Sequence, residues 1–152
     1  MWRSEPESGV SDKRLTLRIA NDIAELTRVA ESVDEFCATH NLPPDCSFKL
    51  NVALEELLTN TISYGYDDRQ RHEIALDIAI DKDTLVAELS DDARPFDPLQ
   101  APPPDLDSPI AERRIGGLGV HLVKTMMDEV TYAYRDGRNH VRLRKRIAAA
   151  SG

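Results

Sequence analysis

The chain has 152 residues, of which 41% are hydrophobic and 30% are charged, and these values fit one globular domain with a single core. The formal net charge of -8 disfavours general nucleic-acid binding, which usually requires a basic surface. A single phosphate site remains compatible with this charge, because it needs only a local group of hydrogen-bond donors.

Neither the ends of the chain nor its cysteines indicate export. Residues 1–14 lack the apolar stretch of a signal peptide and are predicted to be a disordered lead-in, and residues 147–152 are predicted to be a flexible tail. No apolar run is long enough to span a membrane. Cys37 and Cys46 have no metal-like or redox-like spacing, so we expect reduced core thiols in a cytoplasmic protein.

The first half of the chain predicts one strand followed by two helices. Residues 15–20 alternate between apolar and polar side chains, as a half-buried strand does. Asn21 and Asp22 are expected to cap a helix that runs to about residue 40. A second pattern with helical spacing covers residues 45–64.

The second half predicts two strands, a long loop, a helix and a hairpin. Residues 73–80 and 85–90 alternate and are expected to form strands. The segment 98–115 is irregular and holds five of the nine prolines, and a loop of this length in a small domain is usually functional or disordered. A helical pattern follows GGLG (116–119), and residues 128–145 predict the closing hairpin.

These elements predict a single domain of the α/β (α+β) class over residues 15–146. Three helices are expected to cover one face of a mixed, mostly antiparallel sheet, in a two-layer sandwich. The other face of the sheet is expected to be partly solvated or used by a partner.

Glu56 and Asn60 are four residues apart on the second predicted helix. This spacing places them about 40° apart around the helix axis, whereas Glu55 points about 100° away from Glu56. A carboxylate can deprotonate a nearby hydroxyl, and an amide oxygen one turn away can hold Mg²⁺. The alternative is an ordinary solvent-exposed face, because a glutamate followed by an asparagine one turn later is common on helices.

Two further patterns are weak individually and gain weight from their order in the chain. Asp91 directly follows a predicted strand, where it can accept a hydrogen bond from a ligand or cap its own backbone. The glycines of residues 116–119 allow backbone N–H groups to approach a phosphate at a helix start. This run is neither a dinucleotide fingerprint nor a Walker A loop, since it follows a loop and lacks the Gly-Lys-Ser/Thr ending.

The order of these patterns resembles the GHKL ATPase family, which has the Bergerat fold, and within it the anti-sigma-factor serine/threonine protein kinases. EELLTNTISYGY (55–66) is similar to the N-box of that family, DDARPFDP (91–98) to its G1 box and GGLGVHLV (116–123) to its G2 box. The resemblance covers roughly residues 15–146.

The resemblance implies a role for individual residues. Glu56 corresponds to the catalytic glutamate, the general base toward a partner serine or threonine, and Asn60 to the asparagine that ligates Mg²⁺. Asp91 corresponds to the aspartate that recognises the adenine amino group, and residues 98–115 correspond to the ATP lid. At the end of the lid, either Arg113 or Arg114 could reach the terminal phosphates. The remaining implied nucleotide contacts come from the G2 box: Gly116, Gly117, Leu118, Gly119 and Val120.

The sequence departs from the family pattern at two positions. Ala93, which also belongs to the implied nucleotide contacts, replaces the glycine of the G1 box. A positive φ at this position would strain an alanine, and its methyl group would crowd the nucleotide. The histidine that often follows the N-box asparagine is also absent, with Tyr64 in its neighbourhood.

The resemblance implies a cytoplasmic protein serine/threonine kinase that uses ATP and Mg²⁺, sequesters a sigma factor and phosphorylates a small STAS-type anti-anti-sigma protein. The alternatives are an ATP-binding regulatory module without kinase activity and a nucleotide-free interaction domain. The resemblance also implies a homodimer, which we expect to form through an exposed face of the first strand where Leu15, Leu17 and Ile19 alternate. We expect no nucleic-acid or membrane partner.

Overall fold

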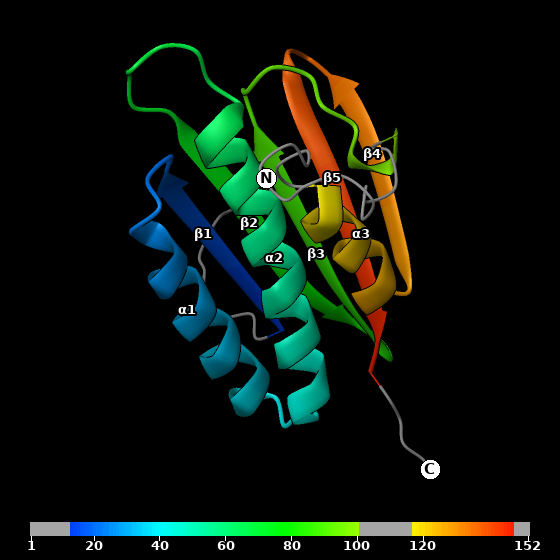
Figure 1. Ribbon diagram of the computed structural model, residues 1–152. Helices are drawn as coiled ribbons and strands as arrows, with labels where there is room; N and C mark the ends of the chain where they lie inside the picture. The colour runs from blue at the N-terminus through cyan, green and yellow to red at the C-terminus, as the bar shows by residue number, and fades with distance from the viewer. Residues whose placement is uncertain (1–12, 101–116, 148–152) are drawn as a thin grey trace.

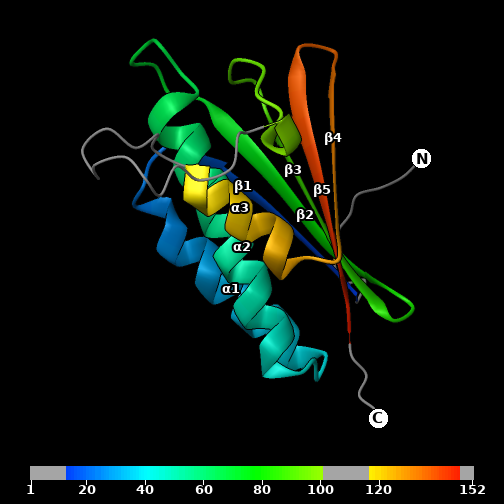
Figure 2. The same ribbon diagram turned by 45° about the vertical axis from the view of Figure 1, so that its right-hand side comes forward.

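The computed structural model describes residues 13–100 and 117–147, with the side chains of residues 117–121 excepted. Three helices lie together on one face of a five-stranded sheet (Figures 1 and 2). The strands, in the spatial order β1-β2-β3-β5-β4, are β1 (Arg14–Ala20), β2 (Glu73–Asp81), β3 (Thr84–Asp91), β5 (Arg138–Arg146) and β4 (Glu129–Arg135). The helices are α1 (Glu25–Thr39), α2 (Pro44–Tyr64) and α3 (Gly117–Met126), with a short 3-10 helix η2 at Pro98–Gln100. The predicted two-layer α/β sandwich is confirmed.

The sheet is antiparallel in all four of its described pairings, so the prediction that it is mixed is wrong. The connection from β1 to β2 contains two helices, which return the chain to the end of the sheet that it left and make these neighbours antiparallel. β4 runs in the same direction as β3, but β5 lies between them and pairs with both.

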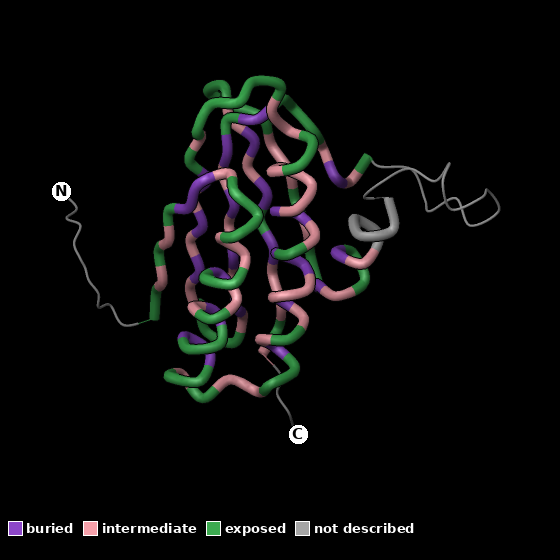
Figure 3. Tube along the Cα trace, turned by 60° about the vertical axis from the view of Figure 1, so that its left-hand side comes forward, coloured by how far each residue is buried: buried purple, intermediate pink, exposed green. Residues whose placement is uncertain are grey.

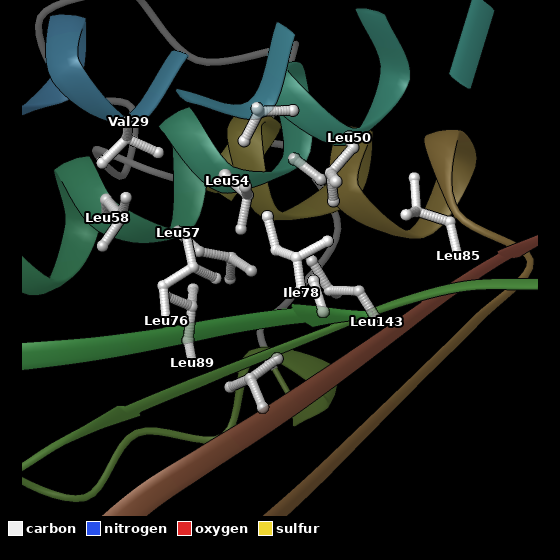
Figure 4. Packing of buried hydrophobic residues seen from close by; sticks show 14 of the residues in the cluster. Val29, Leu50, Leu54, Leu57, Leu58, Leu76, Ile78, Leu85, Leu89 and Leu143 are labelled. Atoms are coloured by element: carbon white, nitrogen blue, oxygen red, sulfur yellow. The ribbon is translucent and has the colours of Figure 1, made fainter. Parts of the chain in front are cut away.

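The core lies between the helices and the sheet and is almost entirely aliphatic. Alternate residues of β2 and β3 point toward the helices, as strand geometry requires, and they meet the apolar side of α2 (Figure 4). The buried residues of α2 share one side of that helix: Cys46, Leu50, Ala53, Leu54, Leu57 and Leu58. Figure 3 shows the same pattern along the chain, with buried positions recurring on the inner sides of helices and strands.

The first helix begins later than predicted. α1 starts at Glu25, and Asp22 uses its Oδ1 to accept the N–H of Ala24 in the turn before the helix, at 2.9 Å. The Glu25 carboxylate reaches back and accepts the N–H of Ala20 at 2.9 Å. Ile23, which was expected on the core side of the helix, is 48% exposed because it belongs to this preceding turn.

The apolar residues of β1 face the helices, so the predicted exposed apolar face on this strand is wrong. Ile19 is buried in the core, and Leu15 and Leu17 pack against it. The opposite side of β1 carries polar residues, and Arg18 forms an ion pair there with Glu73 of β2. Among the described helices, none has both the length and the apolarity that crossing a bilayer requires.

Candidate functional site

Asp91 is a charged residue at a position where the strand pattern places apolar side chains. It is the last residue of β3, in the same inward-facing row as Leu85, Ala87 and Leu89, and only 6% of it is exposed. Its Oδ1 accepts two hydrogen bonds, from the Nδ2 of Asn139 at 2.9 Å and from the N–H of Ala93 at 3.1 Å. Both bonds use Oδ1, and Oδ2 makes none among the described residues. One carboxylate oxygen is therefore held by the protein, and the other has no hydrogen-bond partner among the described residues.

Asn139 of β5 is the partner that orients Asp91 and the turn after it. Besides Asp91, its Nδ2 donates to the carbonyl oxygens of Ala93 and Arg94, at 3.2 and 3.0 Å. Its Oδ1 accepts the N–H of Phe96 at 3.1 Å and the hydroxyl of Tyr132 at 2.6 Å. A backbone N–H can only donate and a carbonyl can only accept, so these partners fix which end of the amide faces Asp91.

Two opposing effects act on the Asp91 carboxyl. Burial is the larger and raises the pKa of Asp91 above its ordinary value. The hydrogen bonds from Asn139 and Ala93 and the charge of Arg138 act in the opposite direction, because each stabilises the ionised form. The ionisation of this group therefore depends on its neighbours on β5 and in the following turn.

The turn that follows Asp91 is fastened to the end of α2. The N–H of Arg94 donates to the carbonyl oxygen of Gly65 at 3.0 Å. A Cβ on Gly65 would lie 2.6 Å from the Thr61 carbonyl oxygen and 2.8 Å from the Cβ of Ala93, so only glycine allows this approach. The loop that holds Asp91 and the helix that carries Glu56 and Asn60 are thus in direct contact.

Ala93 is not strained, contrary to the expectation from the family pattern. The described residues other than glycine with positive φ are Asn41, Lys82 and Asp136, so φ of Ala93 is not positive. Its methyl group is buried and packs against Gly65. The substitution is accommodated because Gly65 has no side chain.

The described part of α2 places Glu56 and Asn60 beside the buried side of the helix. Both are half-buried, whereas Glu55 is exposed, as their angular separation predicted. Neither Glu56 nor Asn60 makes a hydrogen bond or ion pair among the described residues. Burial, and secondly the charge of Glu55, raise the pKa of Glu56 above its ordinary value, which makes its carboxylate a better proton acceptor.

The glycine-rich segment begins a helix, as predicted. α3 starts at Gly117 and packs against α2, so the backbone of residues 117–120 forms its first turn. Gly116, Arg113, Arg114 and residues 101–115 of the predicted lid lie outside the described residues. The predicted contacts of these residues with a nucleotide stay predictions.

A cluster of polar side chains borders Asp91 from the α2–β2 connection. His72 places Nδ1 3.1 Å from Asp92 Oδ2 and Nε2 2.9 Å from Asp68 Oδ1. Tyr66 donates its hydroxyl to Asp92 Oδ1 at 3.2 Å, and its ring stacks on that of His72. Asp68 and then Asp92 raise the pKa of His72, because both accept hydrogen bonds from its ring.

Sequence reasoning missed Asn139 and His72. For Asn139 a signal was present, because it precedes Val141 and Leu143 in the same inward-facing row of β5. A polar residue at such a position needs a buried partner, and the strand register supplies Asp91. No comparable signal marks His72, whose two carboxylate partners come from a loop and from the segment after β3.

A groove of about 450 Å³ on the sheet is lined by residues that include Asp92 and Arg138. Ala75 and Ser90 also line this groove, and most of its other lining residues are charged. Among these side chains Arg18 pairs with Glu73, and Glu88 also pairs with Arg142, which lies outside the lining. The predicted solvated character of the sheet face away from the helices is consistent with such a surface.

Comparison with known proteins gives one consistent result. Residues 19–145 match the histidine kinase-like ATPase domain family. The chain is 32% identical over 92 residues to the serine-protein kinase RsbW of Listeria monocytogenes, covering 58% of this chain and 59% of that one. It is 28% identical over 104 residues to the serine/threonine-protein kinase BtrW of Bordetella bronchiseptica, covering 68% and 73% of the two chains.

A solved structure has a similar fold. The structure of the RsbU and RsbW domains of Rv1364c from Mycobacterium tuberculosis superposes with a TM-score of 0.63 at 15% identity, covering 91% of this chain and 33% of that one. The chain belongs to the histidine kinase-like (GHKL) ATPase family, and the relatives that it matches include RsbW and BtrW kinases. It spans about three-fifths of the length of the Listeria kinase that it matches.

Proposed function

We propose that this chain is an ATP-dependent protein serine/threonine kinase that sequesters a sigma factor and phosphorylates a small antagonist protein. One observation carries the proposal. The helix face with Glu56 and Asn60 is joined, through the contact between Gly65 and Ala93, to the turn that holds the buried Asp91. Three groups with complementary chemistry thus belong to one packed unit.

The residues fit an adenine base at the Asp91 end. An ionised carboxylate only accepts hydrogen bonds, and its Oδ2 has no partner among the described residues. The exocyclic amino group of adenine is a donor and suits this oxygen. Burial of Asp91 removes competing water and makes the match selective.

The residues of α2 fit a phosphate group with its metal ion and an attacking hydroxyl. The amide oxygen of Asn60 is the kind of hard ligand that Mg²⁺ prefers. The Glu56 carboxylate accepts the proton of a partner serine or threonine hydroxyl, and its raised pKa favours that step. ATP with Mg²⁺ supplies the phosphoryl group that is transferred, and the protein contributes mainly position and charge.

The alternative is a nucleotide-binding regulatory module without kinase activity. Its main support in the sequence was Ala93, on the assumption that alanine disturbs the G1 turn. Ala93 has no positive φ and its methyl group packs against Gly65, so this support is removed. The retained Glu56 favours the kinase.

The partners are proposed from resemblance. The relatives in Listeria and Bordetella are named as serine-protein and serine/threonine-protein kinases, and we propose a similar activity here in the cytoplasm. A sigma factor and a STAS-type antagonist are the proposed protein partners. We retain the homodimer as a proposal, without the apolar β1 face, because Leu15, Leu17 and Ile19 are used by the core.

The decisive test is phosphate transfer from labelled ATP, with Mg²⁺, to the small regulatory protein encoded nearest to this chain. We expect transfer by the wild type and its loss in Glu56→Gln. Glu55→Gln is the matched control, because Glu55 is adjacent in sequence but exposed. Equal transfer by the wild type and Glu56→Gln would exclude Glu56 as the base.

Nucleotide binding is measured separately, by the shift in melting temperature with Mg·ADP. Glu56→Gln should keep this shift, because a glutamine of the same size preserves packing. A wild type that shows no shift at millimolar nucleotide supports the nucleotide-free interaction domain.

A further inference from the structure

Asp91 and Asn139 form a buried pair on neighbouring strands, and each occupies the same row as apolar residues. They are direct cross-strand partners in the register of β3 and β5, and both are about 5% exposed (6% and 5%). A buried carboxylate is costly unless its charge is compensated by hydrogen bonds. The amide of Asn139 supplies the one side-chain donor to Asp91 among the described residues.

We propose that Asn139 is a specificity-determining residue, which acts through Asp91 by keeping its ligand-facing Oδ2 an acceptor and thereby selects a 6-amino purine over a 6-oxo purine. The proposal rests on the proposed nucleotide-binding function and deepens it. Asn139 is a positioning residue, because it acts on the base only through Asp91.

The chemistry of the two oxygens gives the selectivity. Oδ1 accepts from Asn139 and Ala93, and these bonds are best satisfied by an ionised carboxylate. If Asp91 takes up a proton, Oδ2 becomes a hydroxyl that donates. A donor repels the amino group of adenine and attracts the carbonyl oxygen of hypoxanthine, so the protonation state decides which base fits.

Four other ionisable groups lie near Asp91, and none of them donates a hydrogen bond to its carboxylate. Arg138 favours the ionised form and Asp92 opposes it. Tyr66 and Tyr132 also lie near Asp91, and burial raises the pKa of both phenols, so they stay neutral. None of these four groups donates a hydrogen bond to Asp91, and the side-chain donor among the described residues is Asn139.

The experiment measures dissociation constants for Mg·ADP and Mg·IDP between about pH 5 and pH 8, the range in which proteins are usually most stable. The two ligands differ in the base alone, so the ratio of their constants cancels the titration of the phosphates. We expect the wild type to prefer ADP over most of the range, with the preference falling toward acid pH. In Asn139→Leu the same fall should occur at higher pH, because the ionised form of Asp91 has lost a donor.

Asp91→Asn is the reference variant, because the asparagine amide has a similar shape and cannot ionise. Its amide oxygen can accept from Asn139 and Ala93 as before, while its NH₂ group takes the place of Oδ2. We expect its preference for ADP over IDP to fall by roughly tenfold or more, the equivalent of one hydrogen bond to a charged group, and to be independent of pH.

Tyr132→Phe is the control for a purely structural role of Asn139. It removes a hydrogen bond to the other end of the same amide and leaves the donor to Asp91 in place. We expect its ADP-to-IDP ratio to follow the wild-type pH curve. If Tyr132→Phe shifts the curve as far as Asn139→Leu does, general loosening explains the effect and the proposal is overturned.

Thermal unfolding without nucleotide shows whether each variant folds. If Asn139→Leu does not, Asn139→Ser replaces it, because serine is polar but too short to reach Asp91. A folded variant whose ratio follows the wild-type pH curve overturns the inference about Asn139. Failure of the wild type to bind ADP at any pH instead overturns the proposed function, so the two failures are distinguishable.

Discussion

Gly65 at the end of α2 and Ala93 in the turn after β3 are in such close contact that a Cβ on Gly65 would lie 2.8 Å from that of Ala93. The fold accommodates the methyl group of Ala93 because Gly65 has no side chain. The contact joins the helix of Glu56 and Asn60 to the turn of Asp91.

The first prediction concerns this contact. Gly65→Ala should destabilise the protein by about 1–3 kcal/mol, because the new methyl group meets both Ala93 and the Thr61 carbonyl. Ala93→Gly in the same chain should recover part of that loss, with a coupling energy of about 0.5–3 kcal/mol. Urea unfolding of the two single variants and the double variant measures the coupling. Strictly additive effects would show that the two positions do not act on each other.

Asn60→Ala should abolish the Mg²⁺-dependent stabilisation by ADP and leave the fold intact. Asn60 makes no hydrogen bond among the described residues. Alanine is also more favourable than asparagine in a helix, by roughly a few tenths of a kcal/mol. Melting curves with and without Mg·ADP test this. Asn51→Ala is the matched control on the same helix, where the amide donates to Asp34. A collapse of the melting curve of Asn60→Ala without nucleotide would identify Asn60 as a structural residue.

The pH dependence of phosphate transfer should respond to Glu55. After burial, the charge of Glu55 is the second cause that raises the pKa of Glu56. The base works when ionised, so activity should fall as the pH drops through this raised pKa. Glu55→Gln removes the neighbouring charge and should move that fall to lower pH, with little change at neutral pH. If the pH profile of this variant is unchanged, protonation of Glu56 is not the cause of the activity loss at acid pH.

Stability should depend on pH through His72. Its folded-state pKa is raised by Asp68 and Asp92, so its stabilisation is present below the ordinary histidine pKa and is lost as the pH rises through the raised value. The pKa of Asp68 is lowered, chiefly by His72. The stabilisation from this pair is therefore lost at acid pH only as the pH falls through that lowered pKa. The melting temperature of the wild type minus that of His72→Gln should therefore peak at mildly acidic pH. His40→Gln, at the residue that follows α1, is the control. An identical pH profile for both variants would contradict the prediction.

Periodicity in the sequence was sufficient to predict the layers and most element positions. The period of two in residues 73–80 and the helical spacing over 45–64 arise from burial on one side, and burial is what the fold preserves. The start of α1 was predicted too early, because Asp22 makes the same kind of hydrogen bond in a turn as in a helix cap.

The proposed site residues Glu56, Asn60 and Asp91 were predicted from residue type, order in the chain and family pattern taken together. The contacts of Asp91 with Asn139 depend on strand register, and the contact of Ala93 with Gly65 depends on three-dimensional approach. Neither is encoded by local spacing, so the structure was needed to find them.

The position of β5 has a consequence for the order of assembly during synthesis. Asn139 follows Asp91 by 48 residues, and the strand that carries it is inserted between β3 and β4. The nascent chain leaves the ribosome from its N-terminus, so Asp91 has no amide partner until this late strand has emerged and paired. Under the proposed function, the pocket around Asp91 is therefore among the last parts of the newly made chain to be completed, and a chain stalled before residue 139 would lack the amide partner of Asp91.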